Sequence, residues 1–355
     1  MCNFVAIMVK KQIDIRALSA EELQAKLLEM GEKKFRASQV YDWLWKKHIH
    51  SFEEMRNVPK ALRERLSETF KLAKVAIEDV QVSNDGTRKY AFRLAGGQQV
   101  EGVLIPTPSR VTACISSQAG CSLDCTFCAT GLLDLKHNLH AYEIYDQVAL
   151  LRAEAEEHYG RPLSNIVYMG MGEPLLNYRN VMRSVDMVTS PEGLGMSPRR
   201  ITVSTSGVAK MIKRLGDDGA RFEFALSLHS ANDETRSRIM PINDSNNLEM
   251  LREALRYFYD KTGTRVTLEY CIFKDVNDSI QAAKELVVFS RVIPTKVNII
   301  EYNPFPESGF VNTTRKRMDA FIEYLESQKV IVNVRRSRGR DIDGGCGQLA
   351  LRHTK

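Results

Sequence analysis

The stretch that decides the fold is residues 110–131, RVTACISSQAGCSLDCTFCATG. It begins with an apolar, β-branched run that is typical of a buried strand. The strand leads into a loop in which Cys121, Cys125 and Cys128 form a C-x3-C-x2-C run. In βα barrels the chemistry gathers where strands end and loops begin, so this stretch predicts a site at the end of a first strand.

Strand and helix patterns alternate after this stretch. Further strand-like segments are NIVYMG, RITVST, FEFALSLH, RVTLEYCIF and KVNIIEYN, and helical segments include YEIYDQVALLRAEAEEH, NLEMLREALRYFYDKTG and SIQAAKELVVFSR. Six such units predict an α/β fold with a parallel sheet. Because there are six units rather than eight, we expect a partial (βα)6 TIM-like barrel, with a doubly wound open sheet as the alternative.

The chain before residue 107 predicts two smaller parts. Ser19 and Glu22 form a capping box ahead of a helical pattern, and Lys and Arg are frequent in this helical part, which is typical of an RNA-binding accessory domain or of a solvated helix face. A period of two follows, with Asp85-Gly86 and Gly96-Gly97 at hairpin positions. The predicted parts are a helical domain at 1–75, a β-hairpin linker at 76–106, a barrel core at 107–340 and a tail at 341–355.

The composition is that of a folded globular protein. The 355 residues are 43% hydrophobic, and the net charge of +6 permits a polyanionic partner without requiring one. Apolar runs fall short of the roughly 20 residues that span a membrane. The start, MCNFVAIM, has no basic leader or cleavage site, so we read it as a tail or as an upstream start with Met8 the true one. We therefore expect a cytoplasmic protein.

The seven cysteines are an odd number, which is typical of a reducing compartment where clustered thiols serve metal binding or catalysis. A four-iron cluster normally takes four cysteines, so three cysteines on one loop leave one iron open to a ligand outside the protein. The alternative is a structural zinc with His137 or His140 as the fourth ligand. The run lacks the two separated knuckles that such zinc sites usually have.

Further polar motifs follow the predicted strands: GMGEP at 170–174, STSG at 204–207, SLHS at 227–230 and EYNPF at 301–305. All of them would face one mouth of the barrel. The loop with its three cysteines is similar to that of the radical S-adenosylmethionine enzymes, whose open iron binds the amino and carboxylate groups of the cofactor. This resemblance implies a 4Fe-4S cluster held by Cys121, Cys125 and Cys128.

The sequence more closely resembles the RlmN/Cfr family of RNA adenine methyltransferases. CISSQAGCSLDCTFCATG, YMGMGEPLLN, STSG, SLH, NPFP and DIDGGCGQLA stand in the order of that family's motifs, and GCGQLA and SRGRDID look more like the RlmN branch than the Cfr branch. The resemblance implies two molecules of S-adenosylmethionine per turnover. It also implies a set of cofactor-binding residues, namely Gly172, Glu173, Ser204, Ser227, Leu228, His229 and Asn303.

The resemblance assigns three catalytic residues. Cys346, among glycines in the tail, would first accept a methyl group, and the methylene radical made from it would add to adenine. Cys114 would free Cys346 through a transient disulfide, and Glu101 would accept the ring proton. Without the resemblance, Cys114 would be read as core and Glu101 as a surface charge, and Cys271 stays a packing residue.

Carbon 2 of adenine is electron-poor and cannot attack a methyl sulfonium, which is why a radical route is needed. The resemblance implies 23S ribosomal RNA near the peptidyl transferase centre as substrate, and transfer RNA beside the anticodon as a second one. It also implies flavodoxin or ferredoxin as electron donor, and we expect a monomer. Arg335, Arg336, Arg338 and Arg340 would meet phosphates or form a solvated basic face. The alternatives are methylation at carbon 8, as in Cfr, and a zinc-stapled RNA-binding protein.

Overall fold

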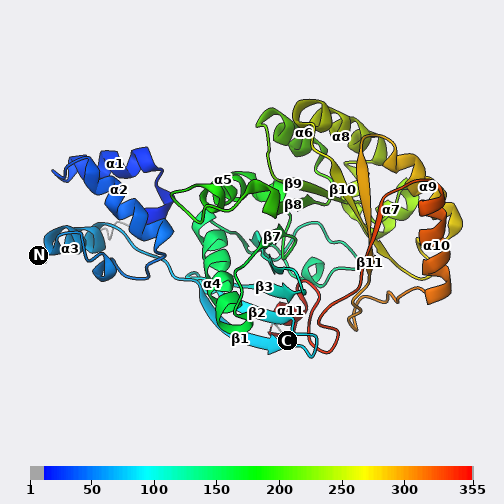
Figure 1. Ribbon diagram of the computed structural model, residues 1–355, viewed down its shortest axis with the longest axis horizontal. Coiled ribbons are helices and arrows are strands. Elements are labelled where there is room, and N and C mark those ends of the chain that lie inside the picture. Colours follow the sequence, from blue (N-terminus) through cyan, green and yellow to red (C-terminus); the bar gives the residue numbers. More distant parts are fainter. Residues whose placement is uncertain (1–11, 354–355) are drawn as a thin grey trace, which may run out of the picture. The chain divides into compact units, whose positions relative to one another are not determined.

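The computed structural model describes residues 12–353 (Figure 1). Met1 and Met8, which are the two candidate start residues, and Cys2 lie outside the described residues. The chain forms two compact units: one runs up to Lys74 and includes Met187–Gly195, and the other contains Val75–Asp186 and the chain from Met196 onward. The domain bounds expected from the sequence stay predictions.

The first unit is helical, with α1 at Ala20–Glu29, α2 at Phe35–Tyr41 and α3 at Lys60–Thr69. The predicted capping box is confirmed: the Ser19 side chain accepts from the Glu22 N–H, and the Glu22 carboxylate accepts from the Ser19 N–H at 2.7 Å. The unit has its own apolar core, formed by buried side chains that include Leu23, Leu27, Val40, Trp45, Leu62 and Leu66.

The predicted hairpins form an antiparallel meander of β1 (Ala76–Val82), β2 (Arg88–Arg93) and β3 (Gln99–Pro106). Gly86 and Gly97 have positive φ angles of 83° and 84°, which is the conformation that tight hairpin turns require of glycine. Because β3 also pairs antiparallel with β4, the meander extends the main sheet. This attachment brings β2 and β3 next to the strands of the site.

The second unit is built on a sheet with strand order β1-β2-β3-β4-β7-β8-β9-β10-β11-β12. All pairs from β4 to β12 are parallel, and β1 and β12 form open edges. The order advances in one direction, whereas a doubly wound sheet reverses, so the partial barrel is confirmed. The six predicted strands are β4 (Val111–Cys114), β7 (Asn165–Tyr168), β8 (Ile201–Thr205), β9 (Glu223–Ser227), β10 (Val266–Ile272) and β11 (Thr295–Glu301).

Strand β12 (Val332–Arg335) was not predicted. Its sequence, VNVR, is short and largely exposed, so it has no apolar run that would identify it as a strand. It pairs parallel with β11, with Val332 opposite Val297 and Arg335 opposite Ile300. This strand carries the chain toward the C-terminal tail.

The parallel strands are connected and covered by helices, and in Figure 1 helices α6, α8, α9 and α10 lie outside strands β8 to β11. Capping residues fix several helix ends: α8 begins after Asn247, whose side chain accepts from the Met250 N–H, and ends at left-handed Gly263. The helices are α4 (Ala141–Tyr159), α5 (Tyr178–Thr189), α6 (Ala209–Asp217), α7 (Asp233–Ile239), α8 (Leu248–Thr262), α9 (Ile280–Ser290), α10 (Arg315–Ser327) and α11 (Gln348–His353).

None of the helices in the described part of the chain is long and apolar enough to span a membrane. A short two-stranded sheet, β5 (Gln118–Ala119) with β6 (His137–Asn138), closes the loop that contains the three cysteines.

Candidate active site

The carboxyl ends of the parallel strands surround a cavity of about 430 Å³. Two of the predicted site residues, Glu101 and Leu228, are not part of its lining. The other predicted residues all contribute to it: Cys114, Cys121, Cys125, Cys128, Gly172, Glu173, Ser204, Ser227, His229, Asn303 and Cys346. The cavity therefore brings together residues more than two hundred positions apart in the chain.

The three cysteines lie on a tightly folded loop after β4. The Cys128 N–H donates to the Cys125 carbonyl at 3.0 Å, and the Cys121 N–H donates to the Leu133 carbonyl at 3.0 Å. Burial raises the pKa of Cys121 to about 11, and burial with the neighbouring thiols also raises the pKa of Cys125 and of Cys128. Metal binding at this loop must therefore displace protons from the thiols.

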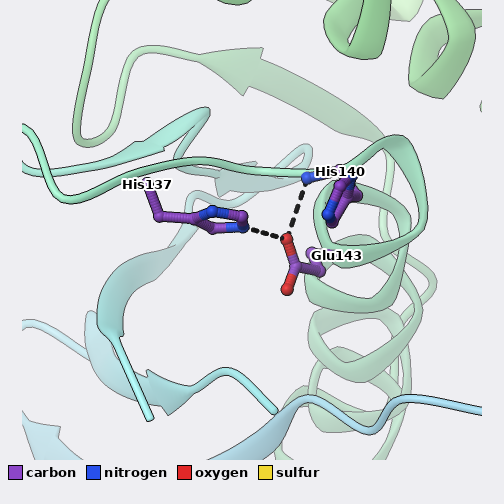
Figure 2. Close-up of side chains that lie close together, drawn as sticks. All are labelled: His137, His140 and Glu143. Atoms are coloured by element: carbon purple, nitrogen blue, oxygen red, sulfur yellow. Dashed lines mark hydrogen bonds and ion pairs between the residues drawn. The ribbon is translucent and has the colours of Figure 1, made fainter. Parts of the chain in front are cut away.

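The zinc alternative required His137 or His140 to join the cysteines. Figure 2 shows both histidines beside Glu143 instead, with His137 Nε2 2.8 Å from Glu143 Oε2 and the His140 N–H donating to the same oxygen. Among the described residues, the groups of three or more possible ligands within 4.8 Å of one another contain no cysteine. Thiolates on one zinc lie about 3.8 Å apart, whereas in a cubane cluster each thiolate binds a different iron. The spacing therefore fits a cluster better than a shared zinc.

The loop after β7 approaches the cysteine-bearing segment closely. Gly172 has a φ of 90°, and a Cβ there would come closer than 3.0 Å to the Gln118 side chain. The buried Glu173 carboxylate accepts from the Leu175 N–H at 3.0 Å and from the Ser206 N–H at 2.7 Å. Burial raises the pKa of Glu173. The carboxylate oxygens are thus fixed in direction, as a receptor for an ammonium group requires.

The ends of β8 and β9 place hydroxyl and imidazole groups at the cavity. Ser204 Oγ donates to the Tyr168 carbonyl at 2.9 Å, and His229 Nδ1 accepts from the Cys271 N–H at 2.9 Å. Since Nδ1 is an acceptor, the His229 ring is neutral and can donate only from Nε2. Leu228 is fully buried, and its carbonyl accepts from Arg236, so the structure does not bring its side chain to the cavity.

The neutral state of His229 predicts a pH effect on stability. Burial and the charge of Arg236 lower the pKa of His229 to about 3 from 6.5, so the unfolded chain binds a proton between these values and the folded chain does not. The contribution of His229 to the free energy of unfolding is therefore fully present above pH 6.5. It decreases, by about a few kcal/mol in all, as the pH drops toward 3. The free energy of unfolding is measured by urea titration at several pH values. As the pH is lowered, it should fall less steeply in His229→Gln than in the parent protein. Parallel curves for the two proteins would contradict the prediction.

Arg236 is a site residue that the sequence analysis missed. Its fully buried guanidinium donates to the Leu228 carbonyl at 3.1 Å, the Ser206 carbonyl at 2.5 Å and Asn243 Oδ1 at 2.8 Å, and so fixes the loops after β8 and β9. In the sequence, Arg236 stands in a polar segment that becomes helix α7. Arginine is common on exposed helices, so the local sequence does not indicate that this one is buried.

Replacing Arg236 by methionine leaves the Ser206 carbonyl and Asn243 Oδ1 without their donor and removes one of the two donors to the Leu228 carbonyl, which keeps the Ser230 N–H. We expect the free energy of unfolding to fall by about 3–5 kcal/mol, measured by urea denaturation. Arg238→Met, on the same helix but exposed, is the matched control and should change it by less than about 0.5 kcal/mol. Equal effects of the two substitutions would show that Arg236 does not hold the loops.

Glu269, on β10, is a second residue that was missed. Its Oε1 accepts from Asn298 at 2.8 Å and lies 3.7 Å from Arg335, but its buried Oε2 has no hydrogen-bond partner within the described chain. Burial raises the pKa of this carboxyl group. A buried acceptor without a donor is costly in the free protein. Because Glu269 lines the cavity, this oxygen is suited to a ligand that carries hydroxyl or amino groups.

Cys346 and Cys114 come together at the cavity. The Cys346 thiol donates to the Met169 carbonyl at 3.1 Å, and its side chain interacts with that of Cys114. The interaction between the two thiols and the charge of Lys89 lower the pKa of Cys114, whereas the same interaction and burial raise the pKa of Cys346. The pair is thus arranged with the thiolate character on Cys114, which suits it as the attacking sulfur in thiol–disulfide exchange.

Glu101 lies beneath the tail rather than at the cavity. Its carboxylate is 2% exposed and is paired with Lys89 at 2.5 Å. It also accepts from the Gly347 N–H at 2.7 Å and from the Ala350 N–H at 2.6 Å. Within the described part of the chain, the hydrogen bonds and the ion pair of this carboxylate are therefore all with Lys89 and the tail.

The four predicted arginines lie along the segment that leads from β12 to the tail. Arg335, Arg336 and Arg338 line the cavity. Three of the four are paired with carboxylates: Arg335 with Glu269, Arg338 with Asp85, and Arg340 with Glu301. These pairs are at least partly exposed on the arginine side, so a phosphate would have to compete with a carboxylate for each of them.

Comparison with known proteins agrees with this arrangement. Residues 13–72 match the ribosomal RNA large subunit methyltransferase N-terminal domain, and residues 115–287 match the radical SAM superfamily. A probable dual-specificity RNA methyltransferase RlmN of Cytophaga hutchinsonii is 56% identical over 98% of this chain and 95% of its own. The dual-specificity RNA methyltransferase RlmN of Nitratidesulfovibrio vulgaris is 45% identical over 95% of this chain and 94% of its own.

A solved structure shows the same fold. The crystal structure of a radical SAM methyltransferase from Sphaerobacter thermophilus is 38% identical, with a TM-score of 0.89 over 95% of this chain and 98% of that one. These relationships leave the zinc-stapled, non-catalytic alternative without support. The chain belongs to the RlmN family of radical S-adenosylmethionine RNA methyltransferases.

Proposed function

We propose that this enzyme methylates carbon 2 of one adenine in 23S ribosomal RNA, and of the adenosine beside the anticodon in transfer RNA, through a methylated Cys346. The observation that carries the proposal is that the interacting pair of Cys114 and Cys346 lines the same cavity as Cys121, Cys125 and Cys128. A carrier thiol, a resolving thiol and a three-cysteine loop at one cavity are the parts that this route needs.

The residues at the cavity fit a 4Fe-4S cluster and S-adenosylmethionine. Three thiols are available on one loop, the Glu173 carboxylate suits the methionine ammonium, and the unpartnered Glu269 Oε2 offers an acceptor to a hydroxyl or amino group. Ser204, Ser227, His229 and Asn303 supply further donors and acceptors. When bound, these groups supply a hydrogen-abstracting radical, and a second S-adenosylmethionine per turnover supplies the methyl group.

The chain's own residues then handle the transfer and release. Cys346 carries the methyl carbon to adenine, which must leave its stack to reach the cavity. Before release, the adduct must lose its ring proton and one electron, which the bound cluster would accept. The Cys114 thiolate then bonds to the Cys346 sulfur while the bond between Cys346 and the transferred carbon breaks, and that carbon keeps the electron pair and takes up a proton to become the methyl group. We retain Glu101 as the candidate acceptor of the ring proton. It must exchange its contacts with the tail before it can reach the ring.

RNA is expected to meet the cavity through Arg335, Arg336, Arg338 and Arg340. The basic helical part at 1–75 is proposed as a further RNA-binding element. The reductive step implies a small electron-transfer protein such as flavodoxin or ferredoxin. A monomer acting in the cytoplasm stays our prediction.

The test is identification of the product. The anaerobically reconstituted enzyme is incubated with S-adenosylmethionine, a reductant and unmodified ribosomal or transfer RNA, and the digested RNA is analysed by mass spectrometry against authentic standards. The expected product is 2-methyladenosine, absent with Cys346→Ala. Detection of 8-methyladenosine would instead support the alternative of a Cfr-like activity, and the absence of both, with the cluster intact, would refute the proposed substrate.

A further inference from the structure

A buried ion pair in the meander holds the segment that contains Cys346. Lys89 on β2 is 0% exposed, and its Nζ lies 2.5 Å from Glu101 Oε2 on β3. The same ammonium donates to the Gly345 carbonyl at 2.8 Å, and the same carboxylate oxygen accepts from the Gly347 N–H at 2.7 Å. The ion pair is therefore hydrogen bonded to the residue before Cys346 and to the residue after it.

The strand register explains how the two charges reach this position. Lys89 lies opposite Val103 in the β2–β3 pair, and Val103 lies opposite Cys114 in the β3–β4 pair. Residues opposite one another, or two positions along a strand, share one face of a sheet. Lys89, Glu101 and Cys114 therefore project from the same face, which is the face that the tail covers.

The free-energy cost of burying the Lys89–Glu101 pair indicates that the pair serves to position the tail rather than to stabilise the fold. Burying two charges is costly before their attraction is counted, and apolar replacements of buried ion pairs are often as stable. Here both charges are also bonded to main-chain groups of the tail, so the pair directs the tail with charge-assisted hydrogen bonds. Apolar side chains at these two positions would fill the core equally well, but they could not make these hydrogen bonds.

We propose that Lys89 is a positioning residue that, together with Glu101, fixes the peptide groups on both sides of Cys346 so that its sulfur faces Cys114 and the cavity. The inference rests on the proposed carrier role of Cys346. It gives Glu101 a second task, since the carboxylate holds the tail in the state seen here. It also gives the meander a function as the docking platform of the tail.

Other contacts keep the tail attached when Lys89 is changed. Asp341 accepts from Ser83 at 2.5 Å and from the Asn84 N–H at 2.9 Å, and Gln81 is hydrogen bonded to Asp343 through both its amide nitrogen and its oxygen. Loss of the Lys89 ammonium should therefore shift the segment around Cys346 without releasing the whole tail. This separation makes the proposal testable.

The test is the rate at which Cys114 and Cys346 form a disulfide. The anaerobic, cluster-loaded protein is treated with diamide, which takes up the two electrons and two protons of the thiols, and the linked peptides are quantified by mass spectrometry. In Lys89→Met we expect the rate to fall at least about tenfold, because misplaced sulfurs lose effective concentration. Lys89→Gln keeps a neutral donor for the Gly345 carbonyl, so its rate of disulfide formation should fall less than that of Lys89→Met.

Arg88→Met is the matched control. Arg88 precedes Lys89 on β2, so its side chain points to the opposite face, where it is bonded to the Tyr90 hydroxyl. This control should keep the rate of the parent protein. Unchanged rates in Lys89→Met, or equal losses in Lys89→Met and Arg88→Met, would overturn the proposal.

The same proteins separate this inference from the proposed function. If the Lys89 variants slow disulfide formation but the parent protein makes no methyladenosine, the positioning role holds and the proposed function fails. If the parent protein makes 2-methyladenosine and Lys89→Met forms the disulfide normally, the function holds and the positioning role fails. A purely structural role would lower the melting temperature of Lys89→Met without slowing the reaction of the folded protein well below that temperature.

Discussion

Replacing Cys114 by alanine is expected to leave the enzyme covalently joined to its RNA and to reduce the release of methylated RNA by about a thousandfold or more. The physical reason is that carbon–sulfur bond cleavage needs a sulfur nucleophile beside Cys346. The Cys114 side chain interacts with that of Cys346, and the charge of Lys89 lowers the pKa of Cys114. Gel analysis under denaturing conditions measures the joined species, and mass spectrometry measures the released nucleoside.

Cys271→Ala is the control for loss of a buried thiol. The pKa of Cys271 is raised by burial alone, and its neighbours are apolar side chains such as Phe273 and Tyr302. We expect this variant to release methylated RNA without accumulating the joined species. Cys346→Ala should form neither species, because it lacks the carrier. Normal release of product by Cys114→Ala would show that Cys114 is not the resolving thiol.

Replacing Gly347 by alanine is expected to reduce product formation about 100-fold while the iron content stays unchanged. Gly347 has a φ of 80°, and a Cβ there would come closer than 3.0 Å to the backbone nitrogen of Thr130. Thr130 follows the cysteine loop closely, so the tail rather than the loop should move. A displacement of about 1 Å at a reacting atom is enough for a loss of this size. Iron analysis and product assays on the same preparation provide the measurement.

Gly345→Ala is the matched control on the other side of Cys346. The three atoms nearest to its Cβ would all belong to the end of the Gln348 side chain, which can shift more easily than backbone, and its φ is not in the left-handed region. We expect its product formation to stay within about fivefold of the parent enzyme. A loss in Gly345→Ala as large as in Gly347→Ala would mean that the tail tolerates no side chain anywhere, and that the close approach to Thr130 has no special importance.

The sequence predicted most of the residues at the cavity because they follow strands that are recognisable from local pattern. Ser204, Ser227 and His229 each lie at the end of a β-branched, apolar run, and parallel strands bring such ends together. Leu228 was assigned to the cofactor with its neighbours but has its side chain in the core. Strand β12 was missed because VNVR has no burial pattern of its own and is held by its pairing with β11.

Lys89, Arg236 and Glu269 show why other site residues could not be found in this way. Charged residues are normally exposed, and nothing in the neighbouring sequence shows that these three are buried. Their partners are distant: Lys89 is 256 positions from Gly345, and Arg236 is 30 positions from Ser206. Glu101 was assigned by resemblance as a base, and the sequence could not indicate its contacts with the tail.

The sequence by itself determined the parallel α/β barrel, the helical first unit and the three-cysteine loop, because strand and helix periodicity and ligand spacing are properties of neighbouring residues. Only the tertiary structure decided which residues face one another at the site. The pairing of Cys114 with Cys346 at the cavity and the hydrogen bonds of Lys89 and Glu101 to the tail join the first third of the chain to its end. Such contacts depend on how the sheet brings its strands together, and local pattern carries no information about that pairing.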